Sequence, residues 1–248
     1  MRARANIRKN DQCIVIHNAI HLQASKPRIF LSFPKHRIYQ FLFFDIRSME
    51  DKENSFAYSL LRKQIENFIA LNDADWNQLV PHLKIRKLKK HELFAEVGLV
   101  ANEVGFVLQG MLRHYYIKDG DEKTTYFYFE NHFVTSYISC ITQQASLLSI
   151  EALSDCELIV FPYQAMKQLF EKNMTWQTFG RRIAEYLAIG LEDRMVGLLM
   201  LSAEERYLEL IKGNKKKIIE RIPQHYIANY LGITPVSMSR IRNRLVKK

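Results

Sequence analysis

The sequence has few cysteines and no long apolar run. Its 248 residues include Cys13, Cys140 and Cys156, and no two of them have Cys-x-x-Cys spacing. Three scattered thiols exclude a disulfide framework and a four-cysteine iron–sulfur centre within one chain. The longest apolar cluster, IYQFLFF at 38–44, is shorter than the ~18 residues of a membrane span, and no small-residue cleavage site follows it. We therefore expect a cytoplasmic protein that makes no membrane contact.

Acidic residues are scarce at both ends of the chain. Residues 1–48 hold nine Lys or Arg and two Asp or Glu, and residues 212–248 hold ten and one. Because the formal net charge is +10, residues 49–211 must be acidic overall, at −6. The apolar content of 48% predicts a globular protein, most simply of two domains. An acidic middle joined to a basic C-terminal segment is typical of a nucleic-acid reader.

The predicted secondary structure changes twice along the first part of the chain. Residues 1–48 show no periodicity and are interrupted by Pro27 and Pro34, so they are either a basic extension or an upstream reading-frame extension, and we place no function there. An amphipathic helix is predicted after Met49. From 83 to 162, short runs of alternating residues predict strands, with tight turns at Gly110 and at 119–120. Strands at this spacing favour a small barrel or sandwich.

A helical period returns after residue 163 and forms a stripe about four turns long. Such a stripe either packs on its own domain or pairs with a second subunit. Gly190 and Gly197 are costly inside a helix and would permit a close neighbour, which favours a dimer. Ser202 and Glu205 have capping-box spacing, so a new helix should begin there. The predicted dimer interface comprises Ile183, Leu187, Gly190, Leu191 and Leu198, with Met195 continuing the stripe.

The stretch HYIANYLGITPVSMSRIRNRL, residues 225–245, has the pattern of a helix-turn-helix. Ala228 is small where the second helix would cross, and Gly232 suits the left-handed residue that ends the first helix. Thr234 can cap the second helix, with Pro235 at its first position. Met238 and Ile241, with Leu245, would face the core. The residues predicted to meet DNA are Thr234, Val236, Ser237, Ser239, Arg240 and Arg244.

Several further cations surround this motif. Arg242, Arg244, Lys247 and Lys248 follow the core positions of the second helix, and Lys215 to Lys217 precede the first helix. We interpret these charges as phosphate contacts or as a general positive field.

Taken in order, these segments resemble the cyclic AMP receptor protein and fumarate-nitrate reductase regulator (Crp/Fnr) superfamily. The most specific parts are FVLQGMLRHYYIKDGDEKTTYFYFENHF at 106–133 and residues 222–246. The resemblance implies an α+β fold: an N-terminal β-roll, a double-stranded β-helix of the cyclic-nucleotide-binding type, joined by a long dimerisation helix to a C-terminal winged helix-turn-helix. The implied boundaries are 1–48 for the extension, 49–170 for the helix and sensor domain, 171–201 for the long helix and 202–248 for the DNA-binding domain.

The resemblance also implies partners. These are double-stranded DNA, a second copy of the chain, RNA polymerase and a small-molecule effector whose identity the sequence leaves open. Arg240 matches the family's recognition arginine, which can give two donors to guanine, and Ser237 matches a small hydroxyl residue. Pro235 and Val236 depart from the best-known members, which carry Arg and Glu there, so the half-site should differ.

The cyclic-nucleotide signature is not retained in the sequence. In the family a Gly-Glu pair holds the ribose and an Arg-Ser pair holds the cyclic phosphate. Alignment on Phe133 and on CEL at 156–158 places Thr135 and Ser136 at the first pair and Ser146 and Leu147 at the second. Residues 142–150 contain no Lys or Arg, and an unpaired buried anion is costly, so cyclic AMP is disfavoured. The candidate effector pocket comprises Thr135, Ser136, Ser146, Leu147, Glu192 and Asp193, the last two lying where family members present hydroxyls to adenine.

Other function classes remain as alternatives. A cupin-like metal-dependent enzyme would need a His-x-His pair, which the sequence lacks, and a cyclic-nucleotide signalling protein without DNA binding would need the phosphate arginine. His82, His114 and His132 are isolated candidates for haem ligation and are better interpreted as surface or turn residues. No nucleophile and base pair stands out. We therefore expect a regulator with no catalytic residue, no metal site and no cofactor.

Overall fold

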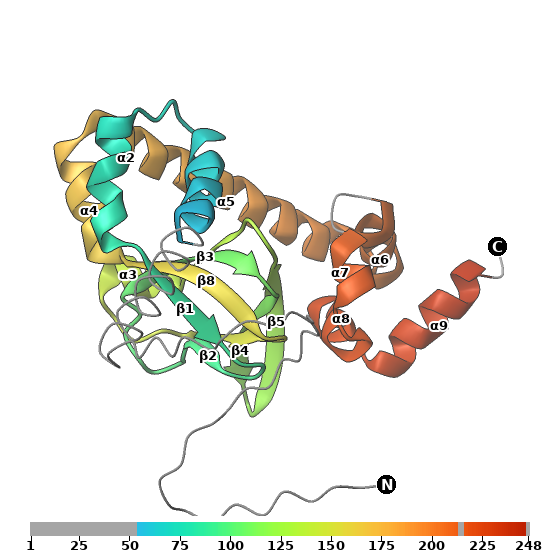
Figure 1. Ribbon diagram of the computed structural model, residues 1–248. Helices are drawn as coiled ribbons and strands as arrows, with labels where there is room; N and C mark the ends of the chain where they lie inside the picture. The colour runs from blue at the N-terminus through green and yellow to red at the C-terminus, as the bar shows by residue number, and fades with distance from the viewer. Residues whose placement is uncertain (1–53, 213–215, 247–248) are drawn as a thin grey trace, which may run out of the picture. The chain divides into compact units, whose positions relative to one another are not determined.

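The computed structural model describes residues 54–212 and 216–246. The predictions for residues 1–48, and those for Lys215, Lys247 and Lys248, lie outside the described residues. A helix over 54–66 comes first. It is followed by the elements labelled in Figure 1: α2 Asp73–Leu79, η1 Val80–His82, β1 Lys84–Leu88, β2 Leu93–Ala95, β3 Glu103–Gln109, β4 Leu112–Lys118, β5 Asp121–Tyr128, β6 Phe133–Val134, α3 Tyr137–Thr142, β7 Leu148–Ala152, β8 Cys156–Pro162, α4 Tyr163–Lys172, α5 Met174–Met200, α6 Ala203–Lys212, α7 Lys216–Arg221, α8 Gln224–Tyr230 and α9 Pro235–Val246.

The strands form two four-stranded antiparallel sheets, in the orders β1-β8-β3-β6 and β2-β7-β4-β5. Gly110 makes the turn between β3 and β4 with φ +100°, and a Cβ there would lie 2.6 Å from the sulfur of Cys156, so only glycine fits. Asp119 and Gly120 both have positive φ, as a two-residue hairpin loop requires. Both predicted turns are confirmed.

An apolar core joins the two sheets. It contains Val107 and Leu158 from the first sheet and Leu112 and Ile150 from the second, all with 0% exposure. Alternation along the strands directs these side chains inward, and their burial from water is the main force that holds the roll closed. The predicted α+β class with a β-roll is confirmed.

A second core packs helices against the roll. Leu61 and Ile65 of the first helix share one buried cluster with Trp176 and Phe179, which lie in the first two turns of α5. Figure 1 shows α2, α4 and the start of α5 gathered on the same side of the strands. This core fixes the N-terminal part of α5, so that the helix leaves the β-roll in a defined direction.

The C-terminal region is helical in its described residues, 203–212 and 216–246, with no strand after β8 there. The wing of the predicted winged motif is therefore not seen in these residues, and α7 lies between α6 and α8. The capping box before α6 is present: the Ser202 N–H donates to Glu205 at 2.8 Å and the Glu205 N–H donates to the Ser202 hydroxyl at 3.3 Å. None of the described helices is long and apolar enough to cross a bilayer.

Candidate nucleic-acid interface and sensor site

The turn between α8 and α9 is built as the sequence predicts. Gly232 has φ +70°, and the N–H of Ile233 donates to the carbonyl of Ala228 at 3.0 Å. Ala228 is completely buried, as is necessary where another helix packs closely. The turn is therefore closed by backbone hydrogen bonds and by a small residue, and the two helices form one unit.

The first turn of α9 is capped by a side chain. The N–H of Ser237 donates to Thr234 Oγ1 at 3.1 Å, and the Thr234 hydroxyl donates to Ser237 Oγ at 3.0 Å. Pro235 is the first residue of the helix, as predicted. Both hydroxyls thus stabilise the helix end as well as lying on the face predicted to meet DNA.

The two faces of α9 differ in exposure. Met238 and Ile241 are buried at 2% and 5%, whereas Val236 is 61% exposed. Ser239 and Arg240 are also exposed. Within the described residues Arg240 is in no salt bridge, while Arg244 is paired with Glu204 of α6 at 2.6 Å. Arg240 is therefore available to an incoming ligand, and Arg244 must first leave its carboxylate.

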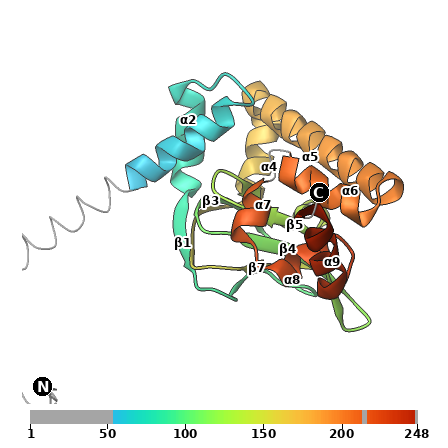
Figure 2. The same ribbon diagram turned by 90° about the vertical axis from the view of Figure 1, so that its right-hand side faces the viewer.

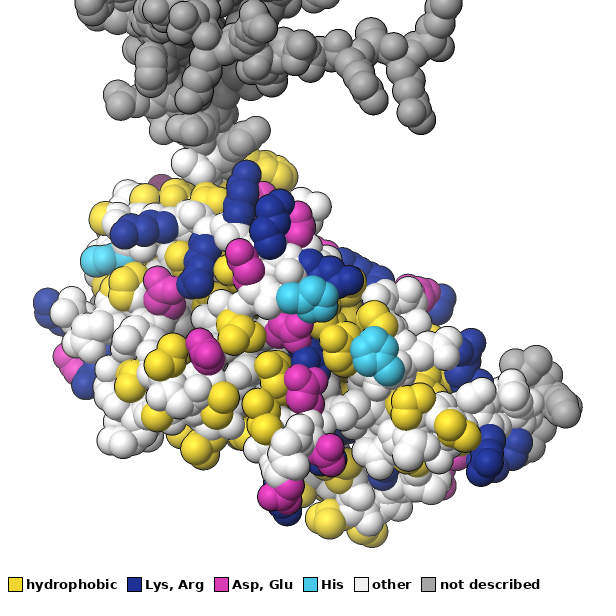
Figure 3. Space-filling view, turned by 90° about the horizontal axis from the view of Figure 1, so that it is seen from below, with side chains coloured by type: hydrophobic (Ala, Val, Ile, Leu, Met, Phe, Trp, Pro, Cys, Tyr) yellow, Lys and Arg dark blue, Asp and Glu magenta, His cyan; other side chains and the backbone are white. Residues whose placement is uncertain are grey.

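Positively charged side chains lie beside this helix, as they do on other parts of the surface. Figure 3 shows Lys and Arg side chains at the right-hand end of the molecule, where α9 lies. An exposed helix face with adjacent cations is the arrangement that attracts a duplex and places side chains in its major groove.

Helix α5 divides the predicted dimer stripe into two parts. Ile183 packs against the apolar core of its own chain and Leu187 is half-buried, whereas Leu191 is 71% exposed. A Cβ added at Gly190 or Gly197 would meet nothing within 4 Å. The C-terminal part of the helix exposes an apolar surface, here called the α5 stripe, made of Ile189, Leu191, Met195, Val196, Leu198, Leu199 and Met200.

Two of the residues aligned with the nucleotide signature are joined to each other. Ser136 and Ser146 are 1% and 2% exposed, and their hydroxyl oxygens lie 2.8 Å apart. The Ser146 hydroxyl lies 2.7 Å from the carbonyl of Leu148. The hydroxyl hydrogens of both serines are thus used inside the protein.

The remaining pocket candidates do not converge. Thr135 donates to the carbonyl of Glu103 at 2.9 Å and lies against the Cys140 thiol. Leu147 is 72% exposed and points out of the roll. Glu192 and Asp193 are exposed on α5. The structure therefore brings Ser136 and Ser146 together, and Thr135 is the neighbour of Ser136 in the chain. The Leu147 side chain faces outward and does not join them.

The interpretation of His114 as a surface or turn residue is wrong. It lies within β4, its Nδ1 contacts the Thr125 hydroxyl, and burial lowers its pKa to about 4. Its ring makes edge contacts with Tyr116 and Tyr128, at 5.5 and 6.4 Å between centroids. Its position in an alternating strand is the sequence signal that a turn assignment overlooked.

Sequence reasoning also missed Arg113, a buried cation in β4. It is 3% exposed, and its guanidinium forms ion pairs with Glu151 and Glu122, both at 2.6 Å. It stacks between the rings of Tyr115 and Tyr226, 4.1 and 4.3 Å from their centroids. Because Tyr226 belongs to α8, Arg113 connects strand β4 with the helix-turn-helix.

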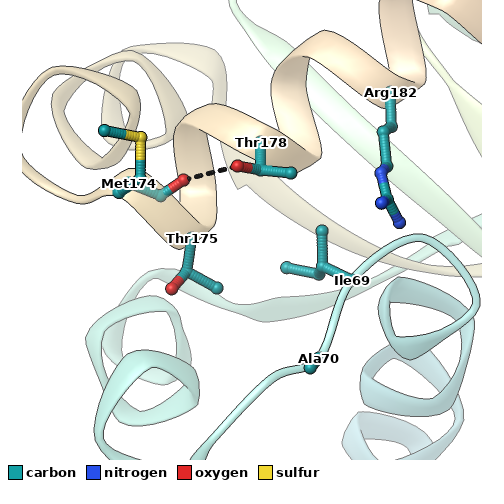
Figure 4. Close-up of a pocket in the computed structure, with 6 residues that line it drawn as sticks. All are labelled: Ile69, Ala70, Met174, Thr175, Thr178 and Arg182. Carbon is teal, nitrogen blue, oxygen red and sulfur yellow. Dashed lines mark hydrogen bonds between the residues drawn. The ribbon is translucent and has the colours of Figure 1, made fainter.

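A surface hollow of about 260 Å³ lies beside the start of α5 (Figure 4). Its lining residues are Ile69, Ala70, Met174, Thr175, Thr178 and Arg182. Thr178 donates to the carbonyl of Met174 at 2.9 Å and Arg182 donates to the carbonyl of Phe68. The Thr178 and Arg182 side chains are thus engaged in hydrogen bonds within the protein, and the hollow contains none of the residues predicted from the sequence. The described residues also contain no group of three or more His, Cys, Asp or Glu placed to bind a metal.

The fold has two parts: the β-roll with its flanking helices, residues 54–172, here called the sensor domain, and helices α6 to α9, here called the reader, with the long helix α5 between them. The comparisons agree with this architecture. Residues 85–173 match the family described as the cyclic nucleotide-binding domain. No curated protein matches the chain.

Solved structures of similar architecture extend the comparison. FixK2 from Bradyrhizobium japonicum is 19% identical over 66% of this chain and 85% of its own, with a TM-score of 0.56. A protein from Eubacterium rectale described as a transcriptional regulator of the Crp/Fnr family is 22% identical over 71% and 85%, with a TM-score of 0.54. The c-di-GMP responsive global regulator CLP from Xanthomonas campestris is 18% identical over 71% and 92%, with a TM-score of 0.51. The chain therefore has the fold of the Crp/Fnr regulators, and the resemblance seen in the sequence is confirmed at that level.

Proposed function

We propose that this protein is a DNA-binding transcriptional regulator rather than an enzyme. The observation that carries the proposal is α9: its inner face is locked by Met238 and Ile241, while Val236, Ser239 and Arg240 are exposed beside a basic surface. Arg240 then reads base edges, whereas Arg244 and the flanking cations contact phosphates. Thr234 and Ser237, at the helix N-terminus, lie where the backbone of a duplex would pass.

The test is selection of bound duplexes from a random-sequence pool with the full chain. We expect one enriched motif with two-fold symmetry, because two identical readers bind two identical half-sites. Uniform recovery of all sequences at low salt, lost on raising the salt, would mean that the basic surface binds DNA without reading it and would contradict the proposal.

The regulator acts as a homodimer joined through α5. The α5 stripe is too apolar to be left in water along half of a long helix, and the absence of a side chain at Gly190 and Gly197 leaves room for a second helix. A second copy supplies an identical stripe, so the contact can close on itself as a symmetric pair. RNA polymerase is the further partner expected of such a regulator.

The effector, in our proposal, is a molecule without a cyclic phosphate. The Ser136 and Ser146 hydroxyls bond to each other and leave no donor for an anion, and Leu147 faces outward. Cyclic AMP would also meet no cation in residues 142–150.

A further inference from the structure

The reader is attached to one edge of the sensor domain. Strand β5 is the last strand in the order β2-β7-β4-β5, so one side of it has no neighbouring strand. Helix α8 lies against this strand, as Figures 1 and 2 both show. An uncovered edge strand presents unpaired N–H and C=O groups, and a protein normally covers or protects such an edge.

The Asn229 side chain hydrogen-bonds to that edge in place of a strand. The N–H of Thr124 donates to Asn229 Oδ1 at 2.6 Å, and Asn229 Nδ2 donates to the carbonyl of Glu122 at 2.7 Å. A carboxamide carries one acceptor and one donor group, so it pairs with both backbone groups at once. At position 229 an ionised Asp would have no donor for the Glu122 carbonyl, and Ala would pair with neither that carbonyl nor the Thr124 N–H.

A bidentate ion pair adds a second attachment. Arg221, the last residue of α7, donates to both carboxylate oxygens of Glu130 at 2.6 and 2.8 Å. These hydrogen bonds hold the pKa of Glu130 below its usual value. The guanidinium also lies over the Phe129 ring, 5.4 Å from its centroid. Parallel hydrogen bonds of this kind fix orientation as well as distance.

Apolar packing surrounds the two polar attachments. Phe127, Phe129 and Leu153 of the sensor domain share one buried cluster with Ile222 and Tyr230 of the reader. The rings of Phe127 and Tyr230 lie 5.5 Å apart. The contact is therefore a continuous interface in which Asn229 and Arg221 specify one position.

The attachment leaves the DNA-reading face uncovered. It uses α7 and α8, whereas α9 contributes only Met238, Ile241 and Leu245 to the shared cluster. Val236 and Arg240 remain exposed. Because the docked reader can still present α9, the contact positions the reader and does not hide it.

We propose that Asn229 and Arg221 are positioning residues for operator recognition, which fix each reader on strand β5 so that the two readers of a dimer are held at the spacing of two half-sites. This inference rests on the proposed function. A fixed reader binds its second half-site as an intramolecular event without first being ordered, whereas a released reader must lose that freedom on binding.

Glu130→Gln is the sharpest variant, because it removes the carboxylate on the sensor side without altering the reader. It also makes the chain more positive, and charge alone would tighten DNA binding. Glu157→Gln is the matched control, because Glu157 lies in β8 and its carboxylate pairs with Lys87 at 3.7 Å and not with a residue of α7 or α8. The probes are the palindromic duplex selected by the wild-type chain and the same duplex with one half-site scrambled.

We expect Glu130→Gln to lower affinity for the palindrome about tenfold and to leave affinity for the single half-site within about twofold. Glu157→Gln should change neither. Asn229→Asp should reproduce the loss and should speed hydrogen exchange of the Thr124 amide, and the exchanged pair Glu130→Arg with Arg221→Glu should recover part of the palindrome affinity.

Three results would overturn the inference. A rise in palindrome affinity would make the contact inhibitory, equal affinities in all variants would make it irrelevant to DNA, and loss of the half-site as well would make it a requirement for the reader's own structure. Failure of the wild-type chain to bind any selected duplex would instead contradict the proposed function.

Discussion

Arg240 and Arg242 are two positions apart on one helix and face different directions. Met238 and Ile241 are buried, which fixes the rotation of α9 and leaves Arg240 on the outer stripe with Val236. Arg242 is exposed to one side of that stripe. Since both residues carry the same charge, comparing them separates base reading from simple electrostatic attraction.

Arg240→Ala should weaken binding to the selected operator by about 1–3 kcal/mol per half-site and relax preference at one base pair. Arg242→Ala should weaken all duplexes alike and reduce the salt dependence by about one unit. Repeating the selection with both variants tests this. An unchanged motif for Arg240→Ala would assign that residue to the phosphates.

His114 gives a pH prediction at the same scale. Its pKa is lowered to about 4 in the folded chain because burial disfavours the charged ring, against about 6.5 when unfolded. The unfolded chain therefore takes up the proton first, so stability is complete above pH ~6.5 and declines as the pH falls from there toward 4. The shift corresponds to a loss of up to about 3 kcal/mol.

Denaturant unfolding between pH 7 and 4 measures this loss, and His114→Gln should show a flatter profile. The decline attributable to carboxylates such as Glu130, whose pKa is lowered by Arg221, should persist in the variant and lie at lower pH. Identical profiles for the wild type and the variant would show that His114 is not the titrating group.

At the scale of one element, α5 combines two environments along its 27 residues. Trp176 and Phe179 anchor its first turns in the core, and its later turns expose the α5 stripe. The start of α5 already packs against the core of its own chain. The exposed apolar residues of its later turns need a second partner to cover them.

Leu191→Glu should split the dimer into monomers. In a symmetric pair the substitution places a buried charge in the interface from each of the two subunits. Sedimentation at micromolar concentration should show a dimer for the wild type and a monomer for the variant, with weaker operator binding. Ile138→Glu is the control, since Ile138 is similarly exposed at 63% but belongs to α3. A monomeric wild type, with and without operator, would disprove the dimer.

At the scale of the whole molecule, the chain has the β-roll of cyclic-nucleotide-binding domains, but the Ser136 and Ser146 hydroxyls at the aligned positions hydrogen-bond to each other. A calorimetric titration of cyclic AMP into the protein should give no saturable heat at physiological concentrations. The reason is that a buried phosphate would lack a cation. Operator binding by the same sample serves as the control for folded protein. A micromolar dissociation constant would contradict this prediction.

The sequence by itself determined the local features of this protein. The turns at Gly110 and Gly232, the capping box at Ser202 and the cap at Thr234 each depend on residues a few positions apart. Strong periodicity likewise identified the long strands and α5. The short strands β2 and β6 carry no such signal, since two or three residues show no period, and β7 carries none because all five of its residues are buried and so do not alternate.

Tertiary structure alone decided the contacts between distant segments. Glu130 and Arg221 are 91 positions apart, and Asn229 bonds to a strand more than 100 residues earlier. The surroundings of Arg113, which is buried, and of His114, which is partly buried, also depend on what covers their strand. A charged or polar residue has the same local sequence pattern whether it meets water or another part of the protein. Only the folded chain therefore shows that Glu130, Arg221, Asn229 and Arg113 join the β-roll to the C-terminal helices.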